Sequence, residues 1–483
     1  MSRFSVSAMT VLALGLGLAA FGPASDAAAH AFGKRYDLPL PLWLWVAGAG
    51  AAVALSFVVS AVFLKHGGAR GPEVSVRLSP WAGRAVRAVS LFLFFLVLAA
   101  CFFGNPETLD NFAPTFVWVI WWVGFAFIAA LFGNIWDAAN PWAALFGYAH
   151  AWAGRPAPRM AYPGGLGHWP AVALFITFAW MELVADAGED PRALGPLILV
   201  YSAITWTGMA VFGRDVWLRH GEVFHNVFWL LARFAPFEGS DGRLRLRLPS
   251  TGLVTEQPAS LSQTVFILVL LTSVTFDGIL ETPAWRDWLV WLNETRLLHG
   301  PLEEIGSRGI NVLRVVKSFA LVALPAVIVL VYGLFAWLTA RAGGGGVSGL
   351  RAAGWFAFSL VPIAIAYHLS HYYSYLMIAG QNMAPLLSDP FGFGWDLFGT
   401  AAIRPDFTLV KAKTVWFLSV TAIVAGHVAA VYLAHETALK IFPGRRRALI
   451  SQIPMMILMI GYTMISLWVL SQPIVSSGAG MNM

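Results

Sequence analysis

Long apolar stretches, separated by shorter polar ones, repeat along most of this chain. Each apolar stretch is close to the roughly 20 residues that a helix needs to cross a bilayer. The pattern therefore predicts an all-α fold, a polytopic transmembrane helical bundle of about ten spans. We place the spans approximately at 41–64, 88–104, 114–133, 169–186, 194–213, 262–281, 314–340, 353–380, 413–436 and 452–471.

The first 29 residues have the pattern of a secretory signal peptide. Arg3 is followed by an apolar core at 11–21 and by small residues up to Ala29. Cleavage after Ala29 would leave residues 30–483 as the mature protein, with His30 at its N-terminus. A terminal histidine can chelate copper through its amine and its ring. Ala31 completes a second small-x-small site, however, and cleavage there would remove His30.

Lysine and arginine gather in alternate connections between the spans. They are frequent in 65–87, in the long connection 214–261 and in 437–451, and sparser in 282–313 and 381–412. Positive loops stay in the cytoplasm. We therefore expect a bacterial inner-membrane protein with both mature termini in the periplasm, a long cytoplasmic loop at 214–261, and periplasmic loops at 282–313 and 381–412. The formal net charge of +6 then reflects topology, and nothing in it indicates nucleic-acid binding.

Two patterns within the long connection predict local structure. Residues 217–237 are amphipathic, so we expect a helix lying along the membrane surface. Residues 243–247 alternate between arginine and leucine, which is typical of a short strand or an extended loop. Elsewhere, Pro325 and Pro362 are candidates for breaks within two spans.

Composition agrees with a membrane protein and leaves few options for thiol chemistry. Hydrophobic residues make up 58% of the chain and charged residues 12%, and the mean hydropathy is +0.69. These values are far from those of soluble proteins. Cys101 is the single cysteine, so disulfides within the chain and cysteine-ligated clusters are excluded.

Five ionisable side chains interrupt the predicted spans. Placing such a group at the centre of a bilayer costs on the order of 2.5–3.5 kcal/mol on insertion scales, and such groups usually face the interior and serve function. They are our candidate site residues. The five are Glu182, Asp277, His368, His371 and His427.

These groups reach overlapping depths in the predicted topology. His368 and His371 are three residues apart, so they share one helix face, roughly 14–18 Å from the outer end of their span. His427 lies about 20 Å from the outer end of its own span. Glu182 and Asp277 lie in the outer halves of theirs. Four spans therefore deliver imidazole or carboxylate groups to one region.

Imidazoles and a carboxylate at one depth suit a divalent transition metal, namely zinc, iron or copper. His368, His371 and His427 are the candidate metal ligands, with Asp277 as a further ligand. Asp277 or Glu182 would act as ligand or general base. Such a site could activate water for attack on an ester, as a metal-dependent hydrolase does.

Three alternatives use the same residues. His368 or His371 could pair with His427 as axial ligands of haem b, although Asp277 and Glu182 would then have no role. The buried carboxylates could instead relay protons in a transporter. The groups could also merely hydrogen-bond to one another and fix helix packing.

Four segments carry a resemblance to a known family. They are 30–44 (HAFGKRYDLPLPLWL), 221–224 (GEVF), 233–236 (RFAP) and 275–285 (TFDGILETPAW). They resemble bacterial multi-pass membrane proteins that are often named fenitrothion hydrolase. The name implies cleavage of an organophosphorus triester to a nitrophenol, and the resemblance assigns no catalytic residues. The expected partners are the lipid bilayer, an unidentified small-molecule substrate and other membrane-protein subunits.

Overall fold

The computed structural model describes residues 36–63, 75–77, 79–185, 188–240 and 242–474. The predicted signal peptide (1–29) and His30 lie outside the described residues. Nine helical segments in the described part of the chain are long and apolar enough to cross a membrane. The remaining predicted span, 169–186, forms α8 (Trp169–Leu183), which is apolar but only 15 residues long. The protein is therefore a multi-pass, all-α membrane protein, as predicted.

The nine spans are formed by one or more elements each. They are α2 (Leu42–Phe63), α3 (Pro80–Phe103), α4 (Phe112–Pro114) with the π-helical segment Thr115–Gly124 and α5 (Phe125–Phe132), α9 (Pro191–Phe212), α12 (Leu261–Leu280), α15 (Val312–Ala342), α16 (Gly349–Ala357) with α17 (Val361–Ala379) and α18 (Met383–Ser388), α19 (Ala412–Ile441) and α20 (Arg445–Ile474).

Shorter elements connect the spans. The helices are α6 (Trp136–Ala139), α7 (Pro141–Trp152), α10 (Arg214–His220), α11 (Val223–Ala232), α13 (Pro283–Glu294) and α14 (Arg296–Ser307). The strands are β1 (Ser75–Arg77), β2 (Phe237–Ser240) and β3 (Arg243–Leu246). Single 3₁₀ turns occur at Thr108–Asp110, Thr251–Leu253, Phe358–Leu360 and Gly380–Asn382.

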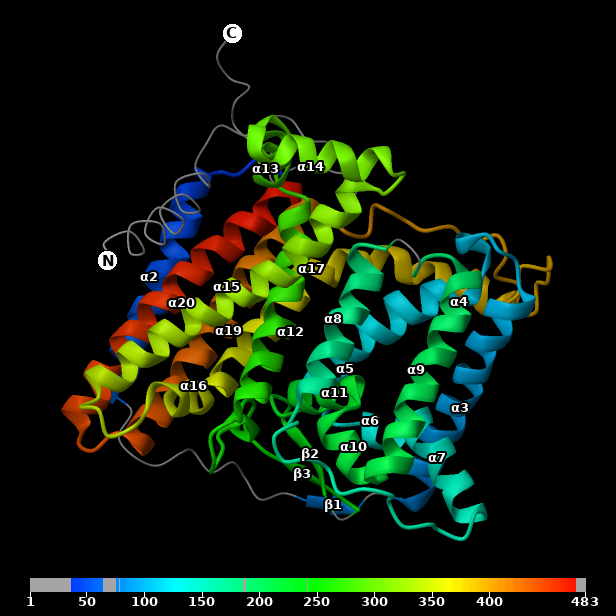
Figure 1. Ribbon diagram of the computed structural model, residues 1–483, viewed down its shortest axis with the longest axis horizontal. Helices are drawn as coiled ribbons and strands as arrows, with labels where there is room; N and C mark the ends of the chain where they lie inside the picture. The colour runs from blue at the N-terminus through cyan, green and yellow to red at the C-terminus, as the bar shows by residue number, and fades with distance from the viewer. Residues whose placement is uncertain (1–35, 64–74, 78, 186–187, 241, 475–483) are drawn as a thin grey trace.

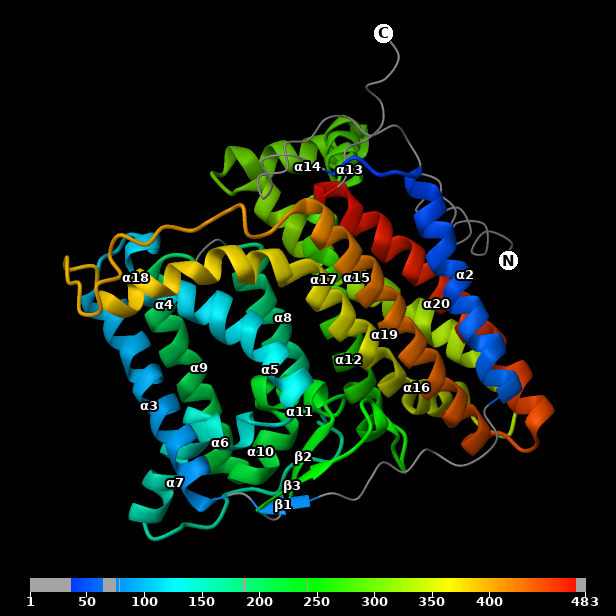
Figure 2. The same ribbon diagram turned by 180° about the vertical axis from the view of Figure 1, so that it is seen from behind.

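Two groups of helices lie side by side, with α8 and α12 between them. One group contains α2, α15, α16, α19 and α20, and the other contains α3, α5, α7 and α9 (Figures 1 and 2). The helix α12 packs against α8, α15, α17 and α20. Because α12 has several neighbours, 72% of the residues in its 18-residue apolar stretch are buried inside the protein. A side chain on α12 is therefore well placed to meet groups from several helices.

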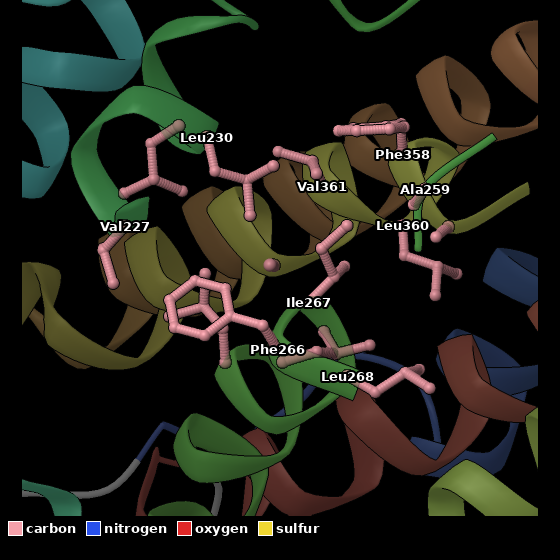
Figure 3. Packing of buried hydrophobic residues seen from close by; sticks show 14 of the residues in the cluster. Val227, Leu230, Ala259, Phe266, Ile267, Leu268, Phe358, Leu360 and Val361 are labelled. Atoms are coloured by element: carbon pink, nitrogen blue, oxygen red, sulfur yellow. The ribbon is translucent and has the colours of Figure 1, made fainter. Parts of the chain in front are cut away.

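The core is centred on the first half of α12 and the start of α17. Phe266, Ile267 and Leu268 are almost fully buried and pack close to Val361, Leu360 and Leu230 (Figure 3). Burying a large apolar side chain stabilises a fold by about 1.5–3 kcal/mol relative to water. In a bilayer this gain is smaller, and close packing provides much of the stability.

The three strands form a small sheet at one end of the bundle, which we call the sheet end; α13 and α14 mark the cap end (Figure 1). The strand order is β1-β3-β2, all antiparallel, with Leu244 facing both Val76 and Gly239. Of the strand and the extended loop that the alternation at 243–247 predicted, the structure has the strand. Arg247 follows β3, and its guanidinium donates to the backbone carbonyls of Ala232, Arg233 and Ala235. It thereby caps the C-terminus of α11.

The predicted surface helix at 217–237 is wrong. The chain forms two helices, α10 and α11, and most of α11 is buried inside the bundle. Val223 and Phe228 have no exposed surface. Glu222 begins α11 by accepting hydrogen bonds from the backbone amides of Phe224 and His225. The polar residues that suggested an outer face are therefore used for capping and internal contacts.

The two prolines differ in their effect. Pro325 lies within the unbroken 31-residue helix α15. Pro362 stands in the first turn of α17, directly after the 3₁₀ turn that separates α17 from α16. Proline suits a first turn because its missing amide would be unpaired there anyway. The break at Pro362 is thus as predicted, and it lies at the start of the helix that carries His368 and His371.

Candidate functional site

A hydrogen-bonded cluster joins α12 to α17. His371 Nε2 lies 2.9 Å from Asp277 Oδ2, and the Tyr372 hydroxyl donates to the same oxygen at 2.7 Å. The His371 ring also packs against the rings of Tyr372 and Tyr367, with centroids 4.7 Å and 6.4 Å apart. Two of the five candidate residues, Asp277 and His371, are therefore in direct contact.

Small and polar residues allow α12 to approach its neighbours here. At Gly278 a Cβ atom would lie 2.7 Å from Val469 of α20 and 3.1 Å from the Tyr367 hydroxyl. One turn earlier, the Thr275 hydroxyl is 2.5 Å from the Tyr462 hydroxyl of α20. Because small residues permit close helix packing, this part of α12 lies close to both α17 and α20.

The cluster lines a cavity of about 600 Å³ at the cap end of the bundle. The cavity lies among the C-terminal ends of α8, α12, α17 and α20 and the N-terminal end of α19. Its ionisable lining groups comprise four carboxyl groups, one imidazole and two phenols. These are Glu182, Glu189, Asp277, Glu281, His371, Tyr372 and Tyr375.

Acidic side chains outnumber basic ones in the lining of the cavity. Four carboxyl groups face one imidazole, and helix C-termini add partial negative charge from their free carbonyls. Lys317 of α15 interacts electrostatically with Asp277, but it does not line the cavity. Trp118 and Phe407 add aromatic faces. Such faces attract cations, and low-dielectric walls strengthen every charge interaction inside the cavity.

A loop between α18 and α19 contributes Phe407 to the cavity wall. Carboxylates hold this loop in shape. Asp389 accepts from the amides of Phe393, Gly394 and Trp395. Hydrogen bonds from the Ala401 amide and the Ser388 hydroxyl lower the pKa of Asp396, which stabilises its ionised form. The wall on this side therefore has a defined conformation without a helix.

Glu182 and His368 lie near the Asp277–His371–Tyr372 cluster but have no hydrogen bond to it that the structure records. Glu182 lines the same cavity from the end of α8. His368 is buried against Phe127 and Tyr372, with ring centroids 5.1 Å and 4.8 Å away, and its Nε2 lies 3.4 Å from the Val123 carbonyl. It is next to the cluster but does not line the cavity.

His427 lies elsewhere in the interior. It has no exposed surface, and its Nδ1 is 2.8 Å from the backbone carbonyl of Ile423. Its Nε2 is buried and has no hydrogen-bond partner among the described residues. Its ring lies 6.3 Å from that of Tyr462. The structure thus does not bring His427 into contact with Asp277 or His371.

The predicted metal ligands do not form a ready coordination shell. In the part of the chain that the structure describes, no group of three or more His, Cys, Asp or Glu side chains is placed to hold a metal ion. Asp277 and His371 bond to each other, whereas His368 and His427 face backbone carbonyls. The present arrangement does not fit the predicted zinc, iron or copper centre, which stays a prediction, as does haem b.

Comparisons with protein-family models, curated proteins and solved structures found no match to this chain. The resemblance to fenitrothion hydrolases therefore stays a prediction.

Sequence reasoning missed several residues that surround Asp277. Tyr372 follows His371 directly, but it stands in an aromatic segment where nothing distinguishes it from Tyr373. Glu281 lies one helical turn beyond Asp277, a spacing that is visible in the sequence, but it was not among the five candidates. Glu189 follows α8 and belongs to a connection whose path the sequence does not give.

Proposed function

We propose that the protein binds a small cation in the acidic cavity from the extracytoplasmic side, and that binding releases a proton from the Asp277–His371 pair. This exchange is the step on which proton-coupled transport depends. The observation that carries the proposal is the lining itself, in which four carboxyl groups face a single imidazole. The positively charged connections near the sheet end support the orientation, because they favour that end in the cytoplasm.

The hydrogen bonds explain how proton and cation would compete. Asp277 Oδ2 accepts from both His371 and Tyr372, so the pair can keep a shared proton in place. A cation near the carboxylate lowers the free energy of its ionised form and weakens its hold on that proton. By linkage, lower pH then weakens cation binding.

A hydrolase is the second candidate, and one observation favours it. A histidine 2.9 Å from a carboxylate oxygen is the usual arrangement of a general base and the group that orients it. The acidic lining opposes this function, however. Attack of water on an ester develops negative charge on oxygen, and any ionised carboxyl group of the lining would repel that charge. Cation binding is therefore the better-supported function.

Thermal unfolding of the detergent-purified protein tests the proposal. Ethylammonium, ethanol and acetate serve as cationic, neutral and anionic probes of similar size. Ethylammonium should raise the unfolding temperature saturably, because a ligand that binds only the folded state stabilises it. Ethanol and acetate should not. Turnover of a neutral nitrophenyl phosphate triester, measured on the same samples, would favour the hydrolase.

Matched variants show where the probe binds. Asp277→Asn and Glu182→Gln should abolish or strongly reduce the shift caused by ethylammonium. Glu182→Gln leaves the Asp277–His371–Tyr372 hydrogen bonds in place. A smaller shift in this variant therefore reflects lost binding of the probe and not a disturbed fold. Asp287→Asn, on the exposed surface of α13, should behave like wild type. An equal shift in all variants, or an equal shift with acetate, would overturn the proposal.

A further inference from the structure

A second cavity, of about 610 Å³, lies on the other side of α8 from the acidic one. It is bounded by α3, the π-helical segment with α5, the short helices α6 and α7, and the helices α8 and α9. Among the described residues, no charged side chain lines it, and three lining residues carry hydroxyl groups. The hydroxyls of Ser90, Thr177 and Tyr201 all donate hydrogen bonds to oxygens of the protein. The cavity therefore offers a ligand apolar contacts and no charge.

The two cavities are separate sites. The Trp118 indole donates to the Gly188 carbonyl at 2.6 Å, and its ring stacks on Phe178 with centroids 5.3 Å apart. These contacts hold the ring in the wall between the cavities, beside α8. A ligand of the apolar cavity therefore has to be explained by that cavity alone.

The apolar cavity is elongated along the spanning helices. Its lining on α3 runs from Ala85 to Val97, and its lining on α9 runs from Leu194 to Ile204. At 1.5 Å per residue these stretches are about 18 Å and about 15 Å long. One leaflet contributes about 15 Å to the hydrocarbon core of a bilayer. The cavity thus has the direction and approximate length of a lipid acyl chain.

The lining extends from the outer surface of the bundle into its interior. Val89 of α3 is 57% exposed and Val200 of α9 is 58% exposed, and both lie within membrane-spanning helices. Val97 and Leu194 line the same cavity, but each is only 4% exposed. In a bilayer the exposed rim meets lipid chains, which can enter without passing through water.

Packing favours hydrocarbon over water as the occupant. Apolar cavities stay dry, because a buried water needs two to four polar partners. An unfilled cavity would leave its lining without the close contacts that stabilise protein interiors. The acyl chains of the surrounding lipids are the apolar groups that reach the rim.

We infer that the apolar cavity binds the acyl chain of one membrane lipid, whose headgroup stays at the membrane surface. The chain completes the packing between α3, α5, α8 and α9. The inference goes beyond the proposed function and does not depend on it, because the two cavities are separate.

Photo-labelling of the full-length protein in lipid nanodiscs tests the inference. The probe is a phosphatidylcholine with a diazirine in one acyl chain, and peptide mass spectrometry identifies the labelled residues. We expect label on Val97 and Leu194, because these buried residues are open to a lipid chain through the cavity. Leu55, exposed on α2, should also be labelled, and Phe266, buried in α12, should not. Label on Leu55 without label on the two cavity residues would overturn the inference.

Variants show whether the label enters through the cavity. Leu93→Trp places a larger side chain in the cavity and should strongly reduce labelling of Val97 and Leu194, while labelling of Leu55 is unchanged. Val200→Trp narrows the rim and should have the same effect even if Leu93→Trp does not fold. Phe319→Trp, on the exposed face of α15, should label like wild type. Equal labelling of the two buried residues in all variants would overturn the inference.

A free aryl diazirine distinguishes a lipid chain from a small apolar molecule. If the free probe labels Val97 and Leu194 and the lipid probe does not, the cavity holds small molecules and the inference is overturned. Ethylammonium takes no part in these measurements. Failure of the proposed cation site would therefore leave the labelling result unchanged, and the two proposals are tested separately.

Discussion

At the scale of single residues, two hydrogen bonds to one carboxylate oxygen define the site. Asp277 and His371 were recognisable in the sequence because ionisable groups are costly within a membrane span. Tyr372 was not, because a tyrosine among apolar residues also suits a membrane interface. Which imidazoles meet a carboxylate depends on how α12 and α17 are rotated, and spacing along one helix does not give that rotation. For this reason His427, at a similar predicted depth, lies apart from the pair.

Gly278 gives a direct test of the packing beside Asp277. In Gly278→Ala the new methyl would meet Val469 at 2.7 Å and the Tyr367 hydroxyl at 3.1 Å. We expect a loss of about 1–3 kcal/mol in the free energy of unfolding, the usual cost of overpacking. Thermal unfolding in detergent measures it. Gly48→Ala in α2, where nothing lies within 4 Å, should be neutral or slightly stabilising. Equal stability of both variants would contradict this packing.

At the scale of elements, the apolar stretches predicted nearly every spanning helix, because length and hydrophobicity alone decide whether a helix crosses a bilayer. The prediction for 217–237 was wrong for a physical reason. An amphipathic pattern indicates that one face is apolar, but it does not say whether that face meets lipid or protein. In this segment Glu222 caps the N-terminus of α11, and the apolar side chains of α11 pack against α5 and α8.

The close crossing of α17 and α19 predicts the effect of a second glycine substitution. In Gly426→Ala the added methyl would lie 2.5 Å from the Ala366 Cβ and 2.7 Å from the Pro362 carbonyl oxygen. The two helices would have to separate, so we expect a loss of about 1–3 kcal/mol and weaker cation binding, since α17 carries His371. Unfolding temperature and ethylammonium binding measure these effects. Gly461→Ala in α20, where no atom lies within 4 Å of the added methyl, is the control. If both variants lose the same free energy of unfolding, the crossing of α17 and α19 is not tight.

At the scale of the whole molecule, successive connections between the spanning helices lie at opposite ends of the bundle. The sheet end contains β1–β3 and the arginine-rich connection, and the cap end contains α13, α14 and the acidic cavity (Figure 1). The sequence predicted about ten spans, and nine helices long enough to cross a membrane lie among the described residues. It also showed the charge bias of the connections. It did not indicate that the ends of five helices enclose a cavity, because this depends on the tilt and neighbours of each helix. The location of the site was thus partly predictable and its shape was not.

Cysteine labelling tests the orientation. In a Cys101→Ser background, we expect Asp287→Cys in α13 to react with a membrane-impermeant maleimide on intact spheroplasts. Arg243→Cys in β3 should react only after permeabilisation, because the positive-inside bias places the sheet end in the cytoplasm. The opposite labelling pattern would reverse the orientation and place the acidic cavity on the cytoplasmic side.

The most direct test of the account is proton release on cation binding. Ethylammonium is added to the purified protein in weakly buffered solution near neutral pH, and the change in pH is converted to protons released per bound cation. We predict net release by wild type and by Asp287→Asn, and none by Asp277→Asn, because the shared proton of the Asp277–His371 pair is its source. Cation binding by wild type without proton release, or undiminished release by Asp277→Asn, would contradict the central claim.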